Sequence, residues 1–600
     1  MQLLTIDFET YYTDKDLGFK RQTTEEYVRD PRFEVIGVAV QVDAGEPVWF
    51  SGDHEATRKW LMQFDWKNSA VLAHNMLFDG CILSWHFGIK PMILFDTLSM
   101  ARALHGVEAG GSLKALAERY QVGVKGEEVV EAINKRRIDF APADLARYGE
   151  YCRNDVRLCY DIFNIMANEF PFEELKLIDM TLRMFTEPQL YIDEATLNER
   201  LQNLTEEKME LLGALKEKLE CETEEEVRKK LSSNKQFAAL LESFGIVVPM
   251  KFSEKQKKEV PALAKKDEGF IALTESEDPF IQQLCAVRLG TKSTLEEKRI
   301  QRFIEIGQRN KGAIPVPLKY YGAHTGRWSG TDKVNFQNLP SRDKKKKALK
   351  NAIVPPDGYV VMNSDSSQIE ARMVAWLAGQ DDVVAQFARG EDVYSLFASA
   401  VYGRTITKAD GEQRFVGKTC ILGLGYGTGA AKLQHTLATS QPISVKIDLE
   451  EAKRIVGVYR DKNHAIIDLW AEGDRMLEDM INGNVPNPVP FGKHKACFYD
   501  NNGIILPNGL RIRYKNLRKE WDEEKQKLTT VYDSRKGKVY IWGGTVVENV
   551  VQALARIVVG HQMMNINEVY RVALTVHDAA VLVVPEDEKE QAEQLVTGLM

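Results

Sequence analysis

The stretch Met362–Gly379, MNSDSSQIEARMVAWLAG, constrains this chain more than any other. Apolar residues from Tyr359 to Met362 predict a short buried strand, and a helical pattern begins at Ile369. Asp365 therefore lies where the strand ends, with its carboxylate able to reach outward. Hard divalent cations take oxygen ligands from such rigid positions, but an Asp before a helix is also a common helix cap. This stretch alone leaves both interpretations open.

A second acidic strand end lies near the C-terminus. Residues 572–585, VALTVHDAAVLVVP, predict two β-branched strands joined at His577-Asp578-Ala579-Ala580. Two carboxylates at the ends of neighbouring strands can hold two metal ions roughly 4 Å apart, the arrangement used for in-line phosphoryl transfer. The alternative is that Asp578 serves only the chemistry of a tight turn.

A third segment favours the phosphoryl-transfer interpretation. In RFVGKTCILGLGYG, four side chains recur every four positions and form one stripe on a helix: Arg414, Lys418, Leu422 and Tyr426. Two cations followed by an apolar group and a phenol suit a nucleoside triphosphate, with its phosphates at one end and its sugar and base at the other. Residues at this spacing on a helix usually pack in a hydrophobic core. The first two residues of this stripe are cations, which a core does not normally bury.

These segments resemble the motifs of family A DNA polymerases, the class of bacterial DNA polymerase I and many phage replicases. SDSSQIEARMVA is similar to the first carboxylate motif, RFVGKTCILGLGYG to the nucleotide-binding finger helix, and VHDA to the second carboxylate motif. HTGRWSG at 324–330 and NFQNLP at 335–340 resemble the primer–template segment that precedes the first motif. Four motifs in the expected order form a far more specific signal than one short motif.

The N-terminal part carries a second set of acids. A predicted helix from Ala143 to about Met166 places Tyr151 and Asp155 one turn apart on the same face. Four acids could together ligate two divalent ions, while Tyr151 orients the attacking water: Asp7, Glu9, Asp79 and Asp155. Each acid taken singly is more typical of a surface or capping position. Their pattern resembles the tyrosine subclass of the DEDD 3′–5′ exonucleases, which implies an active proofreading site for a single-stranded 3′ end.

The two resemblances together imply a multidomain α/β and α+β fold. An RNase H-like exonuclease domain is expected over residues 1–172, followed by a linker over 173–194. A right-hand polymerase domain is expected over 195–600. Its thumb would cover 195–312, its palm 313–379 and 507–600, and its fingers 380–506.

The polymerase resemblance also implies roles for individual residues in adding deoxynucleotides to a primer 3′-hydroxyl. The expected metal ligands are Asp365, Asp578 and the carbonyl of Ser366, with two Mg²⁺ per active site and Mn²⁺ as an alternative. Lys418 is expected to donate a proton to pyrophosphate. The expected dNTP-binding set is Arg414, Lys418, Leu422, Tyr426, Gly427, Glu370 and Gln368. The expected primer–template contacts are Arg327, Asn335, Gln337, Asn338, Lys292, Ser293, Thr294 and His577.

The chain departs from the family pattern at four positions. Leu422 replaces an aromatic residue of the finger helix, and Ala579 replaces a third carboxylate. Gly543 replaces a Gln before the long palm helix, and Tyr394 replaces a His after the first motif. None of these changes removes a predicted metal ligand, so polymerase activity remains the expectation.

Bulk properties restrict the partners. The net charge is −8, so DNA binding must come from local basic patches such as Arg342–Lys350, RDKKKKALK, which could equally be a solvated loop. Seven scattered cysteines without a Cys-x-x-Cys pair favour a reducing compartment and argue against a structural zinc site. With no signal peptide and no membrane-length apolar run, the chain is expected in the cytoplasm. We expect a monomer without an insertion for a processivity partner.

Two further features concern the ends of the chain. No 5′-nuclease segment precedes the exonuclease motifs, which favours a phage replicase over a bacterial repair enzyme. The chain stops at Met600 within a helical pattern, which suggests a truncation.

Two other functions are alternatives to a polymerase. A 3′–5′ exonuclease fused to a non-catalytic, DNA-binding polymerase-like body would lack Asp365 or Asp578, and both are present. A scaffold protein that only binds DNA would need neither acid cluster. Both alternatives are therefore disfavoured by the same carboxylates.

Overall fold

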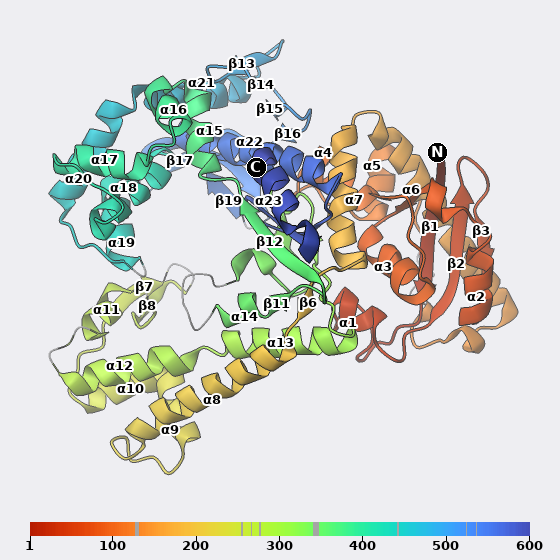
Figure 1. Cartoon of the computed structure of the whole chain (residues 1–600), viewed down its shortest axis with the longest axis horizontal. Helices are drawn as coiled ribbons and strands as arrows, with labels where there is room; N and C mark the ends of the chain where they lie inside the picture. Colours follow the sequence, from red (N-terminus) through yellow and green to blue (C-terminus); the bar gives the residue numbers. More distant parts are fainter. Residues whose placement is uncertain are drawn as a thin grey trace. The chain divides into compact units, whose positions relative to one another are not determined.

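The structure is a computed structural model of the whole chain (Figure 1). It describes residues 1–126, 131–253, 256–265, 267–274, 276, 278–339, 347–440, 443–523, 525–535 and 537–600. Two compact units are present: the first comprises Met1–Leu190, Ile314–Asn338 and Pro355–Met600, and the second comprises Tyr191–Ala313 and Leu339–Val354. Pro340 and the part of the predicted basic patch up to Lys346 lie outside the described residues.

The first unit begins with a five-stranded mixed sheet in the order β3-β2-β1-β4-β5. Its strands are β1 (Gln2–Thr10), β2 (Val35–Val42), β3 (Val48–Phe50), β4 (Ser69–Ala73) and β5 (Ile93–Asp96). β1 pairs antiparallel with β2 and parallel with β4. All five positions of β4 are buried, as expected for a central strand that is covered on both faces.

Helices cover this sheet: α1 (Thr24–Val28), α2 (His54–Leu61), α3 (Met76–Phe87), α4 (Thr97–His105), α5 (Leu113–Tyr120) and α6 (Pro142–Ala167). α6 opens with Pro142 in its first turn, where the missing amide hydrogen costs nothing. It packs on β1 and β2, so its inner face lies against the strand that carries Asp7 and Glu9 (Figure 1).

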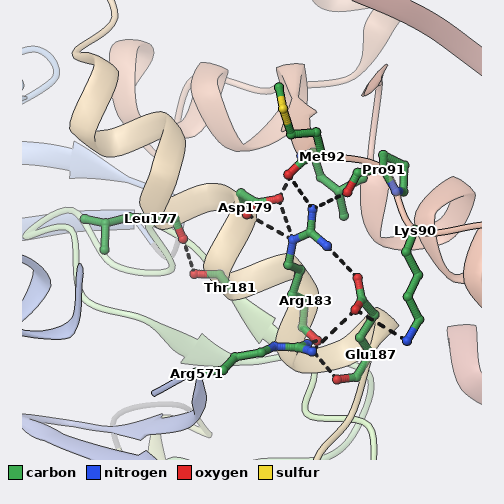
Figure 2. Close-up of polar contacts among 10 residues, drawn as sticks. Lys90, Pro91, Met92, Leu177, Asp179, Thr181, Arg183, Glu187 and Arg571 are labelled. Atoms are coloured by element: carbon green, nitrogen blue, oxygen red, sulfur yellow. Dashed lines mark hydrogen bonds and ion pairs between the residues drawn. The ribbon is translucent and has the colours of Figure 1, made fainter. Parts of the chain in front are cut away.

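The predicted linker contains a folded helix. α7 (Phe172–Thr186) packs on α3 and β5 and also on β20 and α22 of the polymerase segment, whose bounds are given below. Figure 2 shows its C-terminal end, where Arg183 pairs with Asp179 at 2.9 Å and with Glu187 at 2.6 Å. Arg571 donates to the carbonyl oxygens of Arg183 and Glu187 at 2.8 and 2.7 Å. This segment is therefore an ordered connection between the exonuclease and polymerase parts of the first unit.

The second unit is mostly helical. Its helices are α8 (Glu194–Lys216), α9 (Glu224–Ser232), α10 (Asn234–Ser243), α11 (Glu268–Thr274), α12 (Pro279–Lys292), α13 (Leu295–Arg309) and α14 (Ala348–Asn351). It also holds the hairpin β7 (Met250–Ser253) and β8 (Lys258–Pro261), and a short pair of β6 (Tyr191–Ile192) and β11 (Ile353–Val354). Apolar residues of α8, α9, α10 and α12 form its core.

A three-stranded antiparallel sheet in the order β12-β21-β20 positions the predicted polymerase carboxylates. Its strands are β12 (Tyr359–Asp365), β20 (Val572–Val576) and β21 (Ala579–Pro585). Two boundaries differ from the predicted ones: β12 continues through Asp365, and the turn contains only His577 and Asp578. Pairing of β12 with β21 extends the first strand by three polar residues that apolar content alone did not indicate. Helices α15 (Ile369–Ala378), α22 (Gly543–Asn567) and α23 (Lys589–Leu599) accompany this sheet, and β9 (Leu318–Lys319) pairs with β10 (Ser329–Gly330).

The remaining elements lie between α15 and α22 in the sequence. The helices are α16 (Asp381–Ala388), α17 (Val393–Tyr402), α18 (Gly411–Leu424), α19 (Ala430–Thr439), α20 (Leu449–Lys462) and α21 (His464–Asn482). One small sheet contains β13 (Val489–Phe491), β14 (Cys497–Asp500), β15 (Gly503–Ile505) and β16 (Arg511–Ile512), and another contains β17 (Arg518–Asp522), β18 (Lys527–Ser534) and β19 (Gly537–Tyr540). Among the described residues, no helix has the length and apolar content needed to cross a membrane.

Candidate active sites

The first candidate site is built by the register of β12 against β21. Asp365 pairs with Ala579, the residue after Asp578. The amide of Ser366 donates to the carbonyl oxygen of Asp578 at 3.0 Å. The two carboxylates, distant in sequence, therefore lie on adjoining strand ends of one rigid sheet.

The electrostatics of this pair suit a cation. Partial burial raises the pKa of Asp365, the charge of Asp578 raises it further, and His577 opposes the shift. A bound divalent cation would relieve this repulsion, and carboxylate oxygens are the donors that Mg²⁺ prefers. The carbonyl of Ser366, the third predicted ligand, accepts the amide of Ile369 at 3.3 Å and keeps a second lone pair.

Gln337 connects the predicted primer segment to the His577–Asp578 turn. Its side-chain amide donates to the carbonyl of Thr575 at 2.7 Å and accepts from the amide of His577 at 2.6 Å. Asn335 in turn accepts from the amide of Gln337 at 3.0 Å, and Asn338 belongs to the same short 3₁₀ turn. Gln337, predicted to contact the primer, is buried here and braces the β20–β21 turn.

Two residues predicted for different ligands form an ion pair. Arg327, expected at the primer, contacts the carboxylate of Glu370, expected beside the nucleotide sugar. Burial lowers the pKa of Arg327, while the charge of Asp578 opposes that shift. Gln368 caps α15 with a positive φ of 55°, which turns the chain sharply between Asp365 and Glu370.

The predicted cationic stripe lies on α18, and one aromatic residue organises it. The guanidinium of Arg414 lies 5.5 Å from the ring centre of Tyr394, and the ammonium of Lys418 lies 5.9 Å from it. Arg414 also pairs with Asp392 at 2.6 Å. Leu422, the next residue of the stripe, is 40% exposed, so it is no core residue.

The stripe ends earlier than predicted. α18 stops at Leu424, so Tyr426 and Gly427 follow the helix instead of extending it. Gly427 has a φ of 77°, and a Cβ there would meet the Trp542 ring at 2.2 Å. The indole of Trp470 donates to the carbonyl of Gly425 at 2.8 Å. Glycines and the close approach of tryptophan rings break the helix here, a signal that periodicity alone did not include.

The second candidate site gathers acids on β1, α3 and α6. Asp79 accepts the amide of Phe8 at 3.0 Å, which places its carboxylate against the strand between Asp7 and Glu9. Ligand atoms of Asp7, Glu9 and Cys152 lie within 4.8 Å of one another. Tyr151 stacks on Tyr148 with ring centroids 6.0 Å apart.

Burial dominates the electrostatics of this second site. It raises the pKa of Asp7 to about 7, with Asp155 as a further cause. Burial and then the charge of Asp7 also raise the pKa values of Glu9 and Asp79. Buried carboxylates that repel one another form a donor set that fits divalent cations.

Three residues at this site were missed from the sequence. Lys125 pairs with Asp155 and lies 4.7 Å from the ring centre of Tyr151. The hydroxyl of Tyr148 donates to Glu9, and the thiol of Cys152 contacts the Asp7 carboxylate at 3.4 Å. Tyr148 and Cys152 share the inward face of α6 with Tyr151 and Asp155, so their spacing could have indicated them. Lys125 comes from a loop, and no local pattern signals it.

In the second unit, the predicted DNA contacts adjoin another segment rich in small polar residues. Lys292 donates to the side-chain oxygen of Asn234 at 2.8 Å. Ser293 ends α12 and Thr294 begins α13, so both lie at a break between two helices. The buried Arg288 also donates to Asn234, at 2.6 Å, and fixes this junction from within.

Comparison with known proteins finds a family match for each of the two parts of the chain. The family described as "DNA polymerase family A" matches residues 198–475, and the family described as "3'-5' exonuclease" matches residues 27–171. A DNA polymerase of Bacillus phage SP02 is 24% identical over 98% of this chain and 95% of its own. The chain belongs to DNA polymerase family A and carries a 3′–5′ exonuclease domain. The predicted family is thus confirmed, as is a DNA polymerase that carries an exonuclease domain, and the catalysis of this family is metal-dependent.

Two further similar proteins are a DNA polymerase I that matches part of this chain and a solved structure that is similar in fold. DNA polymerase I of Mycobacterium bovis is 34% identical over 30% of this chain, which corresponds to 19% of its own length. The solved polymerase domain of Pol1 from M. smegmatis, in complex with DNA primer-template and dNTP, covers all of this chain at 18% identity with a TM-score of 0.66. The predicted fold, an exonuclease domain followed by a DNA polymerase I-like domain, is therefore confirmed.

Proposed function

We propose that this family A polymerase extends a DNA primer along a template and that its exonuclease domain removes nucleotides from an unpaired 3′ end. One observation carries the polymerase part. The β12–β21 register sets Asp365 beside the Asp578 turn, and the 3.0 Å bond from Ser366 holds the two strand ends together. Two carboxylates on such a base suit in-line phosphoryl transfer.

Asp365, Asp578 and the carbonyl of Ser366 would hold two divalent cations, Mg²⁺ by preference or Mn²⁺. When bound, such ions lower the pKa of the primer hydroxyl and neutralise charge on the triphosphate. The protein residues contribute the rigid strand ends that keep both carboxylates in place.

The cations of α18 would bind the triphosphate of the incoming deoxynucleotide. Lys418 would donate a proton to the leaving pyrophosphate, and Tyr394 lies close enough to both cations to orient them. Arg414 is already held by Asp392, so phosphate binding would share or replace that carboxylate. Leu422 and the Tyr426–Gly427 corner would face the sugar and the base.

Glu370 and Arg327 would act as a pair in the polymerase site. Their ion pair fixes the Glu370 carboxylate. We infer that Glu370 fills the space that a ribose 2′-hydroxyl needs, while Arg327 and the Gln337 segment adjoin the primer terminus. In the minor groove such contacts are nearly independent of sequence.

The exonuclease site would work by the same principle. Asp7, Glu9, Asp79 and Asp155 would hold two divalent cations, and Tyr151 would orient the attacking water. The pKa of Asp7 is raised to about 7, so this buried carboxyl would release its proton near neutral pH when a cation binds.

Replacement of the strand-end acids tests the polymerase site. Asp365→Asn and Asp578→Asn should each slow single-turnover primer extension by far more than about tenfold, or roughly 1.4 kcal/mol of barrier. Asp357→Asn, an exposed acid just before β12, is the matched control and should extend primers normally. Extension by either site variant within about tenfold of wild type would exclude the two-metal assignment.

A further inference from the structure

A cavity of about 870 Å³ lies where the exonuclease and polymerase parts of the first unit meet. One wall is the loop after α4, around Gly106–Ala109, together with Arg119 of α5. The opposite wall comes from the small sheets β13–β16 and β17–β19. The described residues that line this cavity include none of the acids of the two candidate active sites.

The lining is strongly cationic for a chain whose net charge is −8. Five basic side chains line it: Arg119, Arg511, Arg513, Lys515 and Arg535. The lining acids are two, Glu108 and Asp533. This excess of positive charge is local and does not follow from the composition of the chain.

Two of these cations have carboxylate partners: Arg511 pairs with Asp500 at 2.7 Å, and Arg535 lies 3.6 Å from Glu108. Backbone carbonyls are partners of two others. Arg513 donates to the carbonyl oxygens of Leu104 at 3.2 Å and Asn502 at 3.3 Å. Arg119 donates to the carbonyl of Ala109 at 2.8 Å. Burial lowers the pKa of Arg513, and the nearby charge of Arg511 lowers it further. Carbonyl partners position a guanidinium without cancelling its charge, so the cavity retains a field that attracts anions.

Aromatic rings lie among the cations. Tyr321, Tyr514 and Tyr532 line the same cavity, and the rings of Tyr514 and Tyr532 have centroids 5.2 Å apart. The side-chain amide of Asn549 donates to the hydroxyl of Tyr514 at 3.0 Å and fixes that ring. Cations for phosphates beside rings for bases are the two components of a surface that binds single-stranded nucleic acid.

A smaller cavity of about 180 Å³ extends this basic surface. It shares Gly106, Val107 and Arg535 with the larger cavity and adds Arg102 and Lys319. Burial lowers the pKa of Lys319, and the charges of Arg102 and Arg535 contribute to that shift. The cluster of cations therefore extends from Arg535 into the smaller cavity.

We propose that the larger cavity binds a short unpaired stretch of a DNA strand, with its phosphates on Arg119, Arg513 and Lys515 and its bases against Tyr532, the one of the three lining tyrosines that is not buried. The proposal rests on the proposed function, since DNA is taken as the substrate. A duplex hides its base faces by stacking and pairing, whereas an unpaired strand offers phosphates and base faces together. The combined lining therefore favours the unpaired strand.

The test measures single-strand binding by the full chain. Fluorescein-labelled oligodeoxythymidine is titrated in EDTA, which prevents its digestion, and fluorescence anisotropy is read. Arg119→Ala with Lys515→Ala should weaken binding by about tenfold and flatten its salt dependence, because phosphate contacts are lost. Lys453→Ala with Lys462→Ala, two surface cations of α20, removes the same charge elsewhere and should leave binding unchanged.

A second variant tests the aromatic contribution. Tyr532→Leu should weaken binding of oligodeoxythymidine by about fivefold or more, but not binding of an abasic oligomer of equal length. Each variant should keep the wild-type melting temperature and extend a fully paired primer at the wild-type rate. Extension by the wild-type chain is read separately, so failure of the polymerase function would show there first.

Two results would overturn the proposal. Oligodeoxythymidine binding that is unchanged in the folded Arg119→Ala/Lys515→Ala variant would exclude the cavity as a strand site. Equal displacement of oligodeoxythymidine and abasic oligomer by inorganic phosphate, with no effect of Tyr532→Leu, would reduce the cavity to a small-anion site.

Discussion

Single residues set the conditions under which the exonuclease site can bind cations. Lys125 is paired with Asp155. Burial raises the pKa of Asp7 to about 7, and the nearby charge of Lys125 opposes that shift. The ammonium therefore has two opposing effects: it favours ionised carboxylates, and it occupies one of them. Which effect dominates depends on pH.

Removal of the Lys125 charge should steepen the pH dependence of metal binding. In Lys125→Met the carboxylates should hold their protons to higher pH, so Mn²⁺ should bind more weakly than in wild type below about pH 7. Well above that pH all acids are ionised, and loss of the competing ammonium should tighten binding. Mn²⁺ titration by electron paramagnetic resonance at both pH values checks this, with Lys59→Met on α2 as the control. Parallel curves for wild type and Lys125→Met would contradict it.

We expect Leu422 to determine a second property, the discrimination against dideoxynucleotides. It is 40% exposed on the stripe that begins with Arg414 and Lys418. By the family resemblance, a tyrosine here admits dideoxynucleotides because its hydroxyl substitutes for the missing sugar hydroxyl. Leucine has no hydroxyl, so the wild-type protein should discriminate against dideoxynucleotides. The Leu422→Tyr variant should lose much of that discrimination. Single-turnover insertion of dideoxy and deoxy substrates measures the ratio, and an unchanged ratio in a folded variant would remove Leu422 from the nucleotide site.

At the scale of elements, a buried ion pair joins α7 to α22. Arg556 donates to Glu174 at 2.5 Å, and both side chains are almost fully buried. The guanidinium also lies 4.8 Å from the Trp328 ring centre and 5.2 Å from that of Tyr320. Tyr320 and Asn508 donate to the same Glu174 carboxylate, so it is fully occupied.

Loss of one partner of this pair should be costly. Glu174→Gln leaves Arg556 buried without its counter-ion, which typically costs about 3–5 kcal/mol. Because Arg556 lowers the pKa of Glu174, the pair stabilises the fold above the ordinary Glu pKa and loses that effect as pH falls through the lowered value. Thermal unfolding should therefore show a large drop in midpoint at neutral pH that shrinks in acid. Glu174→Gln with Arg556→Met should recover part of the loss, and a double variant less stable than Glu174→Gln alone would argue against this account.

Element boundaries show how far the sequence could lead. Local patterns were sufficient to place Asp365 and Asp578 at strand ends. The predicted burial of the run before Asp365 is wrong, because Tyr359 is exposed and Val360 to Met362 are only partly buried, whereas the run before Asp578 is buried. Local patterns were insufficient for Tyr426, since α18 is ended by the Trp542 ring against Gly427, a contact between distant segments. Lys125 and Asp392 likewise reach their sites through tertiary packing. The Gly543 departure also has a tertiary cause: a Cβ there would meet the Trp470 carbonyl at 1.8 Å.

At the scale of the whole molecule, two acid clusters on separate sheets should act independently. Asp7→Asn with Glu9→Gln should abolish digestion of a single-stranded oligonucleotide and leave single-turnover primer extension unchanged. Glu46→Gln, an exposed acid of the same domain, should affect neither reaction. Digestion that persists in the double variant would place the nuclease elsewhere in the chain, and slowed extension would show that the clusters are coupled.

Helix α7 limits where the gene of such a polymerase can be cut, and how its exonuclease domain can be exchanged. Its Arg183 reaches the carbonyl oxygens of Pro91 and Met92 on one side, while Arg571 reaches back to the same helix end from the other (Figure 2). A gene fragment cut at residue 172 would leave the exonuclease with its α3 face uncovered and the polymerase with buried apolar residues of α7 exposed. Recombination or engineering that exchanges proofreading modules should therefore match α7 to partners on both sides, α3 and β5 of the exonuclease part and β20 and α22 of the polymerase part, wherever the junction falls.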